Sequence, residues 1–221
     1  MTAFKQREGT KGSLKWIQVA VNDRPNLIDD AIRKATGLTG AISWKSPLRA
    51  KDFAEYRDAA FLDQIGQAEL GSALEDFWPQ RGPQWDALAI AGASPILVEA
   101  KSHIPEMCSP PSAAGETSKA KIAKSLSEAS AGLGASPAVP WGPYFYQLAN
   151  RLAHLWFLQS KGIDAKLVLV NFVGDLEQGG PSSQAEWEAA YSVANHVLDL
   201  PRRGKFSSAV AHVYLNVNDL K

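Results

Sequence analysis

The most informative segment of the chain is WDALAIAGASPILVEAK, residues 85–101, in which charged side chains stand at the ends of two apolar runs. Charge in an apolar segment is costly, and such groups usually serve a purpose. The second run alternates, which predicts a strand with Glu99 and Lys101 side by side on one face. The opposite face then carries three apolar side chains that we expect to be buried: Ile96, Val98 and Ala100.

The residues between the two runs are small, which predicts a tight turn. With the hairpin centred between Gly92 and Ala93, Asp86 lies directly across from Glu99, and the Lys101 amine joins the two carboxylates. Carboxylate oxygens are good Mg²⁺ ligands, and an ammonium group beside them orients or helps to deprotonate a water, or stabilises charge on a phosphate. The pattern therefore indicates metal-assisted hydrolysis of a phosphodiester, with Asp86 and Glu99 binding the metal.

An aspartate, a hairpin and then Glu99-Ala100-Lys101 resemble the motif of the PD-(D/E)XK nuclease superfamily, in which an aspartate and an E-x-K tripeptide lie on adjacent strands. Trp85 stands where the family name has proline, at a position that varies in the superfamily. The resemblance implies an α/β fold over about residues 52–173, with a mixed central β-sheet flanked by helices in a restriction-endonuclease-like core. It also implies a nuclease that acts on DNA with Mg²⁺, or Mn²⁺ in its place.

The resemblance implies two supporting residues as well. Residues 66–74 precede the hairpin as a glycine-then-glutamate helix does in archaeal Holliday-junction resolvases, which makes Glu69 a catalytic candidate. Glu75 competes for that role, and a solvated helical carboxylate is an equally good interpretation of Glu69. The tripeptide around Gln147 resembles the Q-x-x-x-Y helix motif of nuclease domains similar to that of the bacterial recombination helicase-nuclease. Arg151 replaces the tyrosine, so only Gln147 is carried over as a positioning residue.

Candidate phosphate-binding side chains lie on two expected helices. One helix, opened by residues 141–143 and closed at 161–162, has a polar stripe beside its apolar face: Gln147, Asn150, Arg151 and His154. If that stripe faces the metal pocket, Arg151 contacts phosphate and His154 lies near it. On a helix expected at residues 119–132, Lys121 and Lys124 are further nucleic-acid-binding candidates, although helical lysines more often form only the solvated face.

The rest of the chain shows the elements that would surround this site. We expect a mobile polar arm at 1–12, strands at 13–22, 166–172 and 209–217, an edge strand or loop at 41–44, and helices at 25–36, 51–78 and 184–198. Gly66 is a point at which the helix at 51–78 would divide in two. A basic cluster, Arg202, Arg203 and Lys205, lies before the last strand. Residues 1–50 then form an N-terminal elaboration of a nuclease-like core at 51–221, within one compact domain.

Composition restricts the class of protein. The 221 residues are 45% hydrophobic and 21% charged, which is typical of a globular protein. The single cysteine, Cys108, excludes an internal disulfide and a cysteine-rich zinc site. Without a long apolar run or a leader pattern, we expect a cytoplasmic protein with no membrane contact. Lys and Arg number 23, as do Asp and Glu, and this balance argues against strong non-specific nucleic-acid binding.

Two other functional classes were compared with the nuclease. A catalytically inactive member of the same fold, which binds nucleic acid or a protein partner, is favoured by the neutral charge. A small-molecule hydrolase with a Ser/His pair is not supported, because the sequence has no nucleophile elbow or plausible triad. The sequence leaves open whether the substrate is DNA or RNA, whether cleavage is internal or terminal, and whether the chain forms a homodimer.

Overall fold

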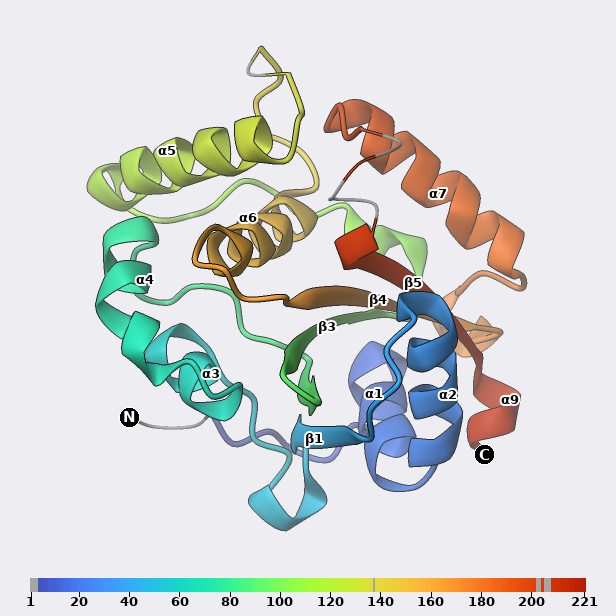
Figure 1. The fold of residues 1–221 in the computed structure, drawn as a ribbon. Helices are drawn as coiled ribbons and strands as arrows, with labels where there is room; N and C mark the ends of the chain where they lie inside the picture. The colour runs from blue at the N-terminus through green and yellow to red at the C-terminus, as the bar shows by residue number, and fades with distance from the viewer. Residues whose placement is uncertain (1–3, 137, 202–203, 205–207) are drawn as a thin grey trace.

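Helices cover both faces of a central β-sheet in the computed structural model (Figure 1). The structure describes residues 4–136, 138–201, 204 and 208–221. Its strands are β1 (Ile42–Ser46), β2 (Ala87–Ala91), β3 (Ser94–Lys101), β4 (Lys166–Val173) and β5 (Val210–Asn216). Its α-helices are α1 (Gly12–Asn22), α2 (Pro25–Thr36), α3 (Asp58–Gln64), α4 (Gly71–Phe77), α5 (Glu116–Gly132), α6 (Tyr146–Ser160), α7 (Gln184–Val197) and α9 (Val217–Leu220). Short 3-10 helices are η1 (Arg49–Lys51), η2 (Ala68–Leu70), η3 (Ile104–Met107) and η4 (Leu176–Gln178).

The strands pair in the order β1-β2-β3-β4-β5 within the described residues. The pairs β1-β2 and β2-β3 are antiparallel, whereas the pairs β3-β4 and β4-β5 are parallel. Parallel neighbours need a long crossover, and the chain makes it through α5 and α6 before β4 and through α7 before β5. The predicted fold class, α/β with a mixed central sheet flanked by helices, is confirmed.

The hairpin between β2 and β3 has the predicted register. Its last pair is Ala91 with Ser94, so the turn is Gly92-Ala93, and Gly92 takes the positive φ of 60° that a tight turn needs. At the other end Ala87 pairs with Val98. Asp86 directly precedes Ala87 and therefore stands across from the strand position of Glu99.

The two faces of the sheet pack against different layers. One layer is formed by α1, α2 and α9, and it meets the predicted buried residues Ile96, Val98 and Ala100, which are 0%, 0% and 1% exposed. The other layer contains side chains from α3 to α7 and packs over the face that carries Leu97. By alternation along β3, Glu99 and Lys101 also belong to this second face.

Residues 13–22 form the helix α1, and the strand predicted there is wrong. The predicted alternation of Ile17, Val19 and Val21 competes with a helical repeat in the same residues. The structure buries the helical set, Trp16, Ile17, Ala20 and Val21, and leaves Val19 only partly buried. The helix prevails because it places all four of these side chains against the sheet.

The single long helix predicted at 51–78 is also wrong. Residues 52–57 are not helical, and Tyr56 instead forms an antiparallel bridge with Trp85. The helical part is divided into α3 and α4, and Gly66, at a φ of 74°, lies in the break as the alternative interpretation expected. Phe61, Ile65 and Leu74 from these residues are buried in one cluster, but periodicity alone does not show where the backbone turns.

The described N-terminal residues are held against the fold, so the mobile arm expected at 1–12 is not what the structure shows from residue 4 onward. Phe4 and Glu55 exchange two backbone hydrogen bonds, of 3.1 and 3.0 Å. The backbone amide of Gly9 donates to Gln18 Oε1 at 2.7 Å. Residues 1–50 thus supply two helices and an edge strand to the same sheet.

Most other expected elements are present. The helix α2 begins at Pro25 and ends before Gly37, which adopts a left-handed φ of 73°. The edge strand, the two parallel strands and the helix at 184–198 are found as β1, β4, β5 and α7. The helix α6 begins at Tyr146, three residues after Pro143, where Phe145 at a φ of 52° precedes it. The basic cluster at 202–205 falls on residues of which only 204 is described.

None of the helices in the described part of the chain combines the length and apolar character needed to cross a bilayer.

Candidate active site

The two strands of the β2-β3 hairpin bring the charged side chains together. Glu99 and Lys101 occupy the carboxyl-terminal end of β3, next to β4. Asp86 lies just before β2, and its neighbour Trp85 is fixed by a backbone hydrogen bond of 3.1 Å to Tyr56. The Asp86 carboxylate reaches across the hairpin and accepts a 2.7 Å hydrogen bond from the backbone amide of Ala100. The predicted trio therefore lies on one face of the sheet.

Glu99 is the centre of a buried ion cluster. Its side chain is 3% exposed, Arg151 Nε donates to its Oε2 at 2.5 Å, and Lys101 Nζ donates to its Oε1. Burial opposes ionisation, but Arg151 and Lys101 outweigh it and hold the pKa of Glu99 below its ordinary value. Burial likewise opposes the charge of Lys101, but Glu99 and Asp86 raise its pKa. At neutral pH the cluster is a carboxylate between two cations.

Arg151 joins α6 to the hairpin through several contacts. Its Nη2 donates to the backbone oxygen of Gln84 at 2.7 Å, and its Nη1 donates to Asn150 Oδ1 at 3.0 Å. The guanidinium also lies 4.8 Å from the centre of the Trp85 ring. The polar stripe of α6 does face the site at Arg151, but the side chain is 3% exposed and pairs with Glu99. The expected solvent-facing phosphate contact requires Arg151 to leave that pair.

Asp86 has a different electrostatic environment from Glu99. Burial raises its pKa to about 8, Glu99 adds to the effect, and Lys101 opposes it. Near neutral pH Asp86 therefore carries a proton. Two facing carboxylates repel each other, and in this protein the proton on Asp86 and the two cations around Glu99 remove that repulsion.

Glu55 is a third carboxylate near this cluster, and it was not predicted from the sequence. It is 5% exposed and accepts hydrogen bonds from Gln84 Nε2 at 2.5 Å and from Gln6 Nε2 at 3.4 Å. Burial raises its pKa, and Glu99 contributes in the same direction. The sequence does show a charged residue among the apolar residues 53, 54 and 56. The helix predicted over this segment gave no reason to place Glu55 near the site.

A small cavity adjoins the ion cluster. Its lining includes Glu99, Lys101, Gln147 and Tyr191, and its volume is ≈ 10 Å³, about enough for one water molecule. Gln147 thus lies beside the predicted catalytic side chains, as the helix motif implied. Tyr191 of α7 was not predicted, and burial raises its pKa with a further contribution from Glu99.

The structure places the other candidates elsewhere. Glu69 lies exposed in η2 and makes no hydrogen bond or ion pair to the described residues, so the supporting role implied for it is not met in this conformation. His154 packs among aromatic rings instead of facing phosphate, with its ring centroid 4.8 Å from that of Trp78. Burial lowers the pKa of His154 to about 3, so its ring is neutral. The binding role expected for His154 does not fit this buried, uncharged environment.

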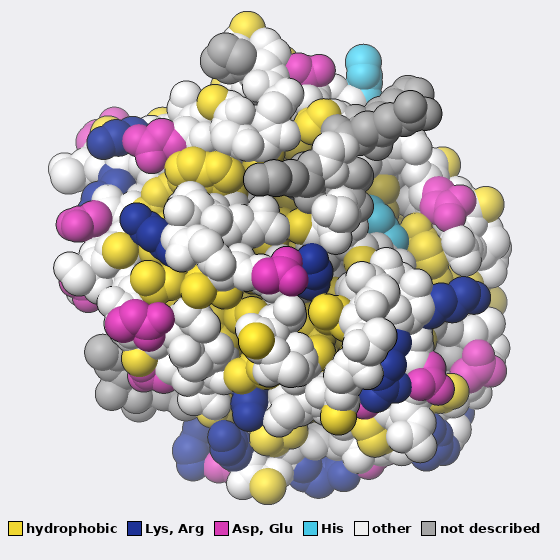
Figure 2. Space-filling model, viewed as in Figure 1, with side chains coloured by type: hydrophobic (Ala, Val, Ile, Leu, Met, Phe, Trp, Pro, Cys, Tyr) yellow, Lys and Arg dark blue, Asp and Glu magenta, His cyan; other side chains and the backbone are white. Residues whose placement is uncertain are grey.

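Of the two candidate lysines of α5, Lys124 is exposed and Lys121 is partly buried. Lys121 Nζ donates to the backbone oxygen of Glu75 at 2.6 Å, and Lys124 forms a weak pair of 3.8 Å with Glu128. Figure 2 shows acidic and basic side chains intermixed on the face that it displays, in keeping with the zero net charge. Contact of these lysines with nucleic acid stays a prediction.

Within the residues that the structure describes, no three His, Cys, Asp or Glu side chains are grouped closely enough to hold a metal by themselves. The two carboxylates expected to bind Mg²⁺ are suitable donors in kind, but Glu99 is engaged with cations and Asp86 is protonated. A metal at this place must therefore compete with Arg151 and with a proton.

Comparisons of the chain with models of protein families, with curated proteins and with solved structures gave no match.

Proposed function

We propose that this protein is a metal-dependent nuclease of the PD-(D/E)XK type that hydrolyses phosphodiester bonds, with DNA as its substrate. The observation that carries the proposal is the position of Asp86, Glu99 and Lys101. Asp86, just before β2, and Glu99 and Lys101, at the end of β3, meet on one face of the sheet, and Glu99 and Lys101 are held there as a buried ion pair. A mixed central sheet flanked by helices is also the arrangement that the resemblance implies.

In this proposal Asp86 and Glu99 hold Mg²⁺ or Mn²⁺, which supplies Lewis acidity and lowers the pKa of a bound water. Lys101 acts as a donor. Its raised pKa keeps it an ammonium group, so it stabilises charge on the phosphate and orients water but does not accept a proton. Gln147, which lines the adjoining cavity, positions the attacking water.

Arg151 has two states in this proposal. Paired with Glu99, it neutralises that carboxylate. Released from Glu99, its planar guanidinium offers two parallel donors to a phosphate. Substrate and metal together would thus replace a contact inside the protein with contacts to the ligand.

One observation favours a second candidate, a nuclease-fold module that binds nucleic acid or a protein partner without cleavage. Both Glu99 oxygens are engaged by Lys101 and Arg151, so the ion cluster is complete without a metal. The zero net charge agrees with either candidate, because it leaves only local basic surface for nucleic acid.

A metal titration separates the two candidates. Under the nuclease proposal, Mg²⁺ or Mn²⁺ raises the melting temperature of the wild type, because a ligand that binds only the folded state stabilises it. It also permits cleavage of single-stranded, duplex or branched DNA. D86N should lose both effects while still folding, because an amide resembles the protonated carboxyl that the structure already holds. K101A should keep the metal response and lose turnover.

Two results would decide against cleavage. A metal-induced rise in melting temperature without cleavage of any of these substrates would favour the binding module. A wild-type melting temperature that is the same with Mg²⁺, with Mn²⁺ and with a chelator would reject the nuclease.

A further inference from the structure

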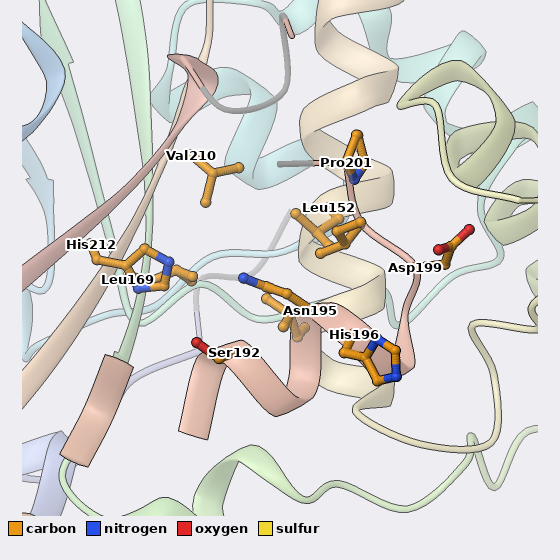
Figure 3. Close-up of a pocket in the computed structure, with 11 residues that line it drawn as sticks. Leu152, Leu169, Ser192, Asn195, His196, Asp199, Pro201, Val210 and His212 are labelled. Carbon is orange, nitrogen blue, oxygen red and sulfur yellow. The ribbon is translucent and has the colours of Figure 1, made fainter. Parts of the chain in front are cut away.

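A second and much larger cavity opens close to the ion cluster, between α6, α7 and the strands β4 and β5 (Figure 3). Its volume is ≈ 630 Å³, within the range of cavities that take small-molecule ligands. Apolar side chains from α6 and the two strands form one wall, namely Leu148, Leu152, Leu169 and Val210. The helix α7 and the chain after it supply polar groups, namely Ser192, Asn195, His196 and Asp199.

This cavity is adjacent to Glu99 through the strand register. Glu99 pairs with Leu169, and Leu169 pairs with His212, so the three lie in one row across the sheet. Neighbouring strands are about 4.8 Å apart, which places the backbone of His212 about 10 Å from that of Glu99. Leu148 and Leu169 line both cavities. Tyr191 lines the small cavity, and its ring centroid is 4.3 Å from that of His212, which lines the large one.

The polar groups that face the cavity centre are uncharged. Burial lowers the pKa of His212 to about 4, and its Nδ1 is buried without a hydrogen-bond partner in the described structure. The side-chain amide of Asn195 likewise makes no hydrogen bond to the described residues. In Figure 3 Ser192 and Asn195 point toward His212. Ser192 Oγ donates to the backbone oxygen of Glu188 at 2.8 Å and keeps lone pairs to accept a hydrogen bond.

Charge in the cavity selects against a phosphate. Its lining contains the carboxylate Asp199, which accepts a hydrogen bond from the Ser136 amide at 2.9 Å. Two cations, Lys101 and Arg151, lie on the other side of the shared wall. An elongated ligand with one anionic and one neutral end would therefore place its anion at Lys101 and its neutral end in the cavity.

We propose that the cavity is a base subsite, which takes the nucleobase of the nucleotide next to the phosphodiester held at Lys101. A base is flat and uncharged, with apolar faces for the leucine wall and an edge of donors and acceptors for Asn195 and His212. A side-chain amide matches the adjacent acceptor and donor on the adenine edge, so adenine is the preferred base. The assignment rests on the proposed nuclease function for its link to cleavage, but binding of the base alone does not.

The first experiment measures nucleoside binding without catalysis. Adenosine is titrated into the isotopically labelled full chain in a chelator-containing buffer, and amide shifts are followed by NMR. We expect shifts at residues 192–199 and 210–212, and about tenfold weaker binding by N195A, the loss expected for one hydrogen bond. V193A, on an exposed site of the same helix, should bind like the wild type. No shifts at these residues up to millimolar adenosine, or equal affinities of N195A and wild type, would overturn the subsite.

The second experiment links the subsite to the reaction. The p-nitrophenyl ester of adenosine 5′-monophosphate carries a base, whereas bis(p-nitrophenyl) phosphate does not. With metal present, N195A should lower kcat/KM about tenfold for the first ester and leave it unchanged for the second. An equal loss for both esters would assign Asn195 a structural role and overturn the subsite.

The two proposals fail separately. Cleavage of DNA without adenosine binding overturns the base subsite alone. Adenosine binding at these residues without hydrolysis of any phosphodiester overturns the nuclease and supports a nucleobase site.

Discussion

The two faces of β3 contain opposite kinds of side chain, although they belong to the same eight residues. Toward α1 and α2 the strand presents Ile96, Val98 and Ala100, which pack into an apolar layer. Toward α6 it presents Leu97 and then Glu99 and Lys101, which are 3% and 8% exposed. Both faces of β3 are buried, but among the side chains of this strand the ions lie on the second face.

The difference shows that β3 can be packed without ions, because its first face is held by apolar side chains alone. Each Å² of apolar surface that the first layer removes from water stabilises the folded state by roughly 25 cal/mol. This stabilisation needs no charged partner and does not depend on pH. A buried ion pair is conditional, because desolvation offsets its attraction and the loss of one member leaves the other uncompensated. Apolar residues hold the strand on its other face, and the proposed function assigns the charges on the α6 side to ligand binding.

The largest effect is expected for R151M. It leaves Glu99 buried with Lys101 as its remaining cation, and we expect a loss of about 3–5 kcal/mol in the free energy of unfolding, measured by urea denaturation at pH 7. The triple variant Glu99→Leu, Lys101→Met, Arg151→Met should recover most of that loss, because it makes the second layer resemble the first. Stability of R151M within about 1 kcal/mol of wild type would show that the pair is weakly formed.

A smaller effect is expected for I96A in the apolar layer. Removal of a fully buried side chain should cost about 3 kcal/mol, by the same measurement. Unlike the loss in R151M, this loss should not change between pH 5 and pH 9, because no titrating group is involved. A clear pH dependence of the I96A effect would mean that the two layers are coupled through the sheet.

Asp86 should give the ionic layer a characteristic pH dependence. Its pKa is raised from 3.8 to about 8 in the folded state, so between these values the folded chain binds a proton that the unfolded chain does not. Stability from this group is therefore present at low pH and is lost as pH rises to about 8. Relative to D86N, the wild type should lose stability progressively across that window, by up to about 1.4 kcal/mol per pH unit, measured by denaturation at a series of pH values. A constant difference would contradict the raised pKa.

The smallest effect is expected for K124A, which lies outside both layers. Its exposed pair with Glu128 should contribute less than about 0.5 kcal/mol to stability. If Lys124 contacts phosphate, the variant should bind DNA more weakly at low salt. The slope of the logarithm of its affinity against the logarithm of the salt concentration should be smaller by about one. Unchanged binding would assign this lysine to the solvated surface of α5.

Local patterns were sufficient for the centre of the fold. Small residues between two apolar runs predicted the Gly92-Ala93 turn, and the turn determined which residue faces Glu99. Alternation along β3 placed Glu99 and Lys101 on one face because the strand period is two residues. Proline and glycine marked the two ends of α2 because their backbone preferences act within a few residues. Each of these inferences depends on short-range geometry, and each is confirmed.

Long-range contacts decided the rest. Residues 13–22 satisfied both a strand and a helix pattern, and packing against the sheet selected the helix. Glu99 and Arg151 are 52 positions apart, and nothing local indicates that they form an ion pair. The same holds for Glu55 and His212, whose roles depend on what folds over them. Periodicity shows which face a side chain occupies, but its partner, its burial and hence its pKa depend on distant segments that only the tertiary structure brings together.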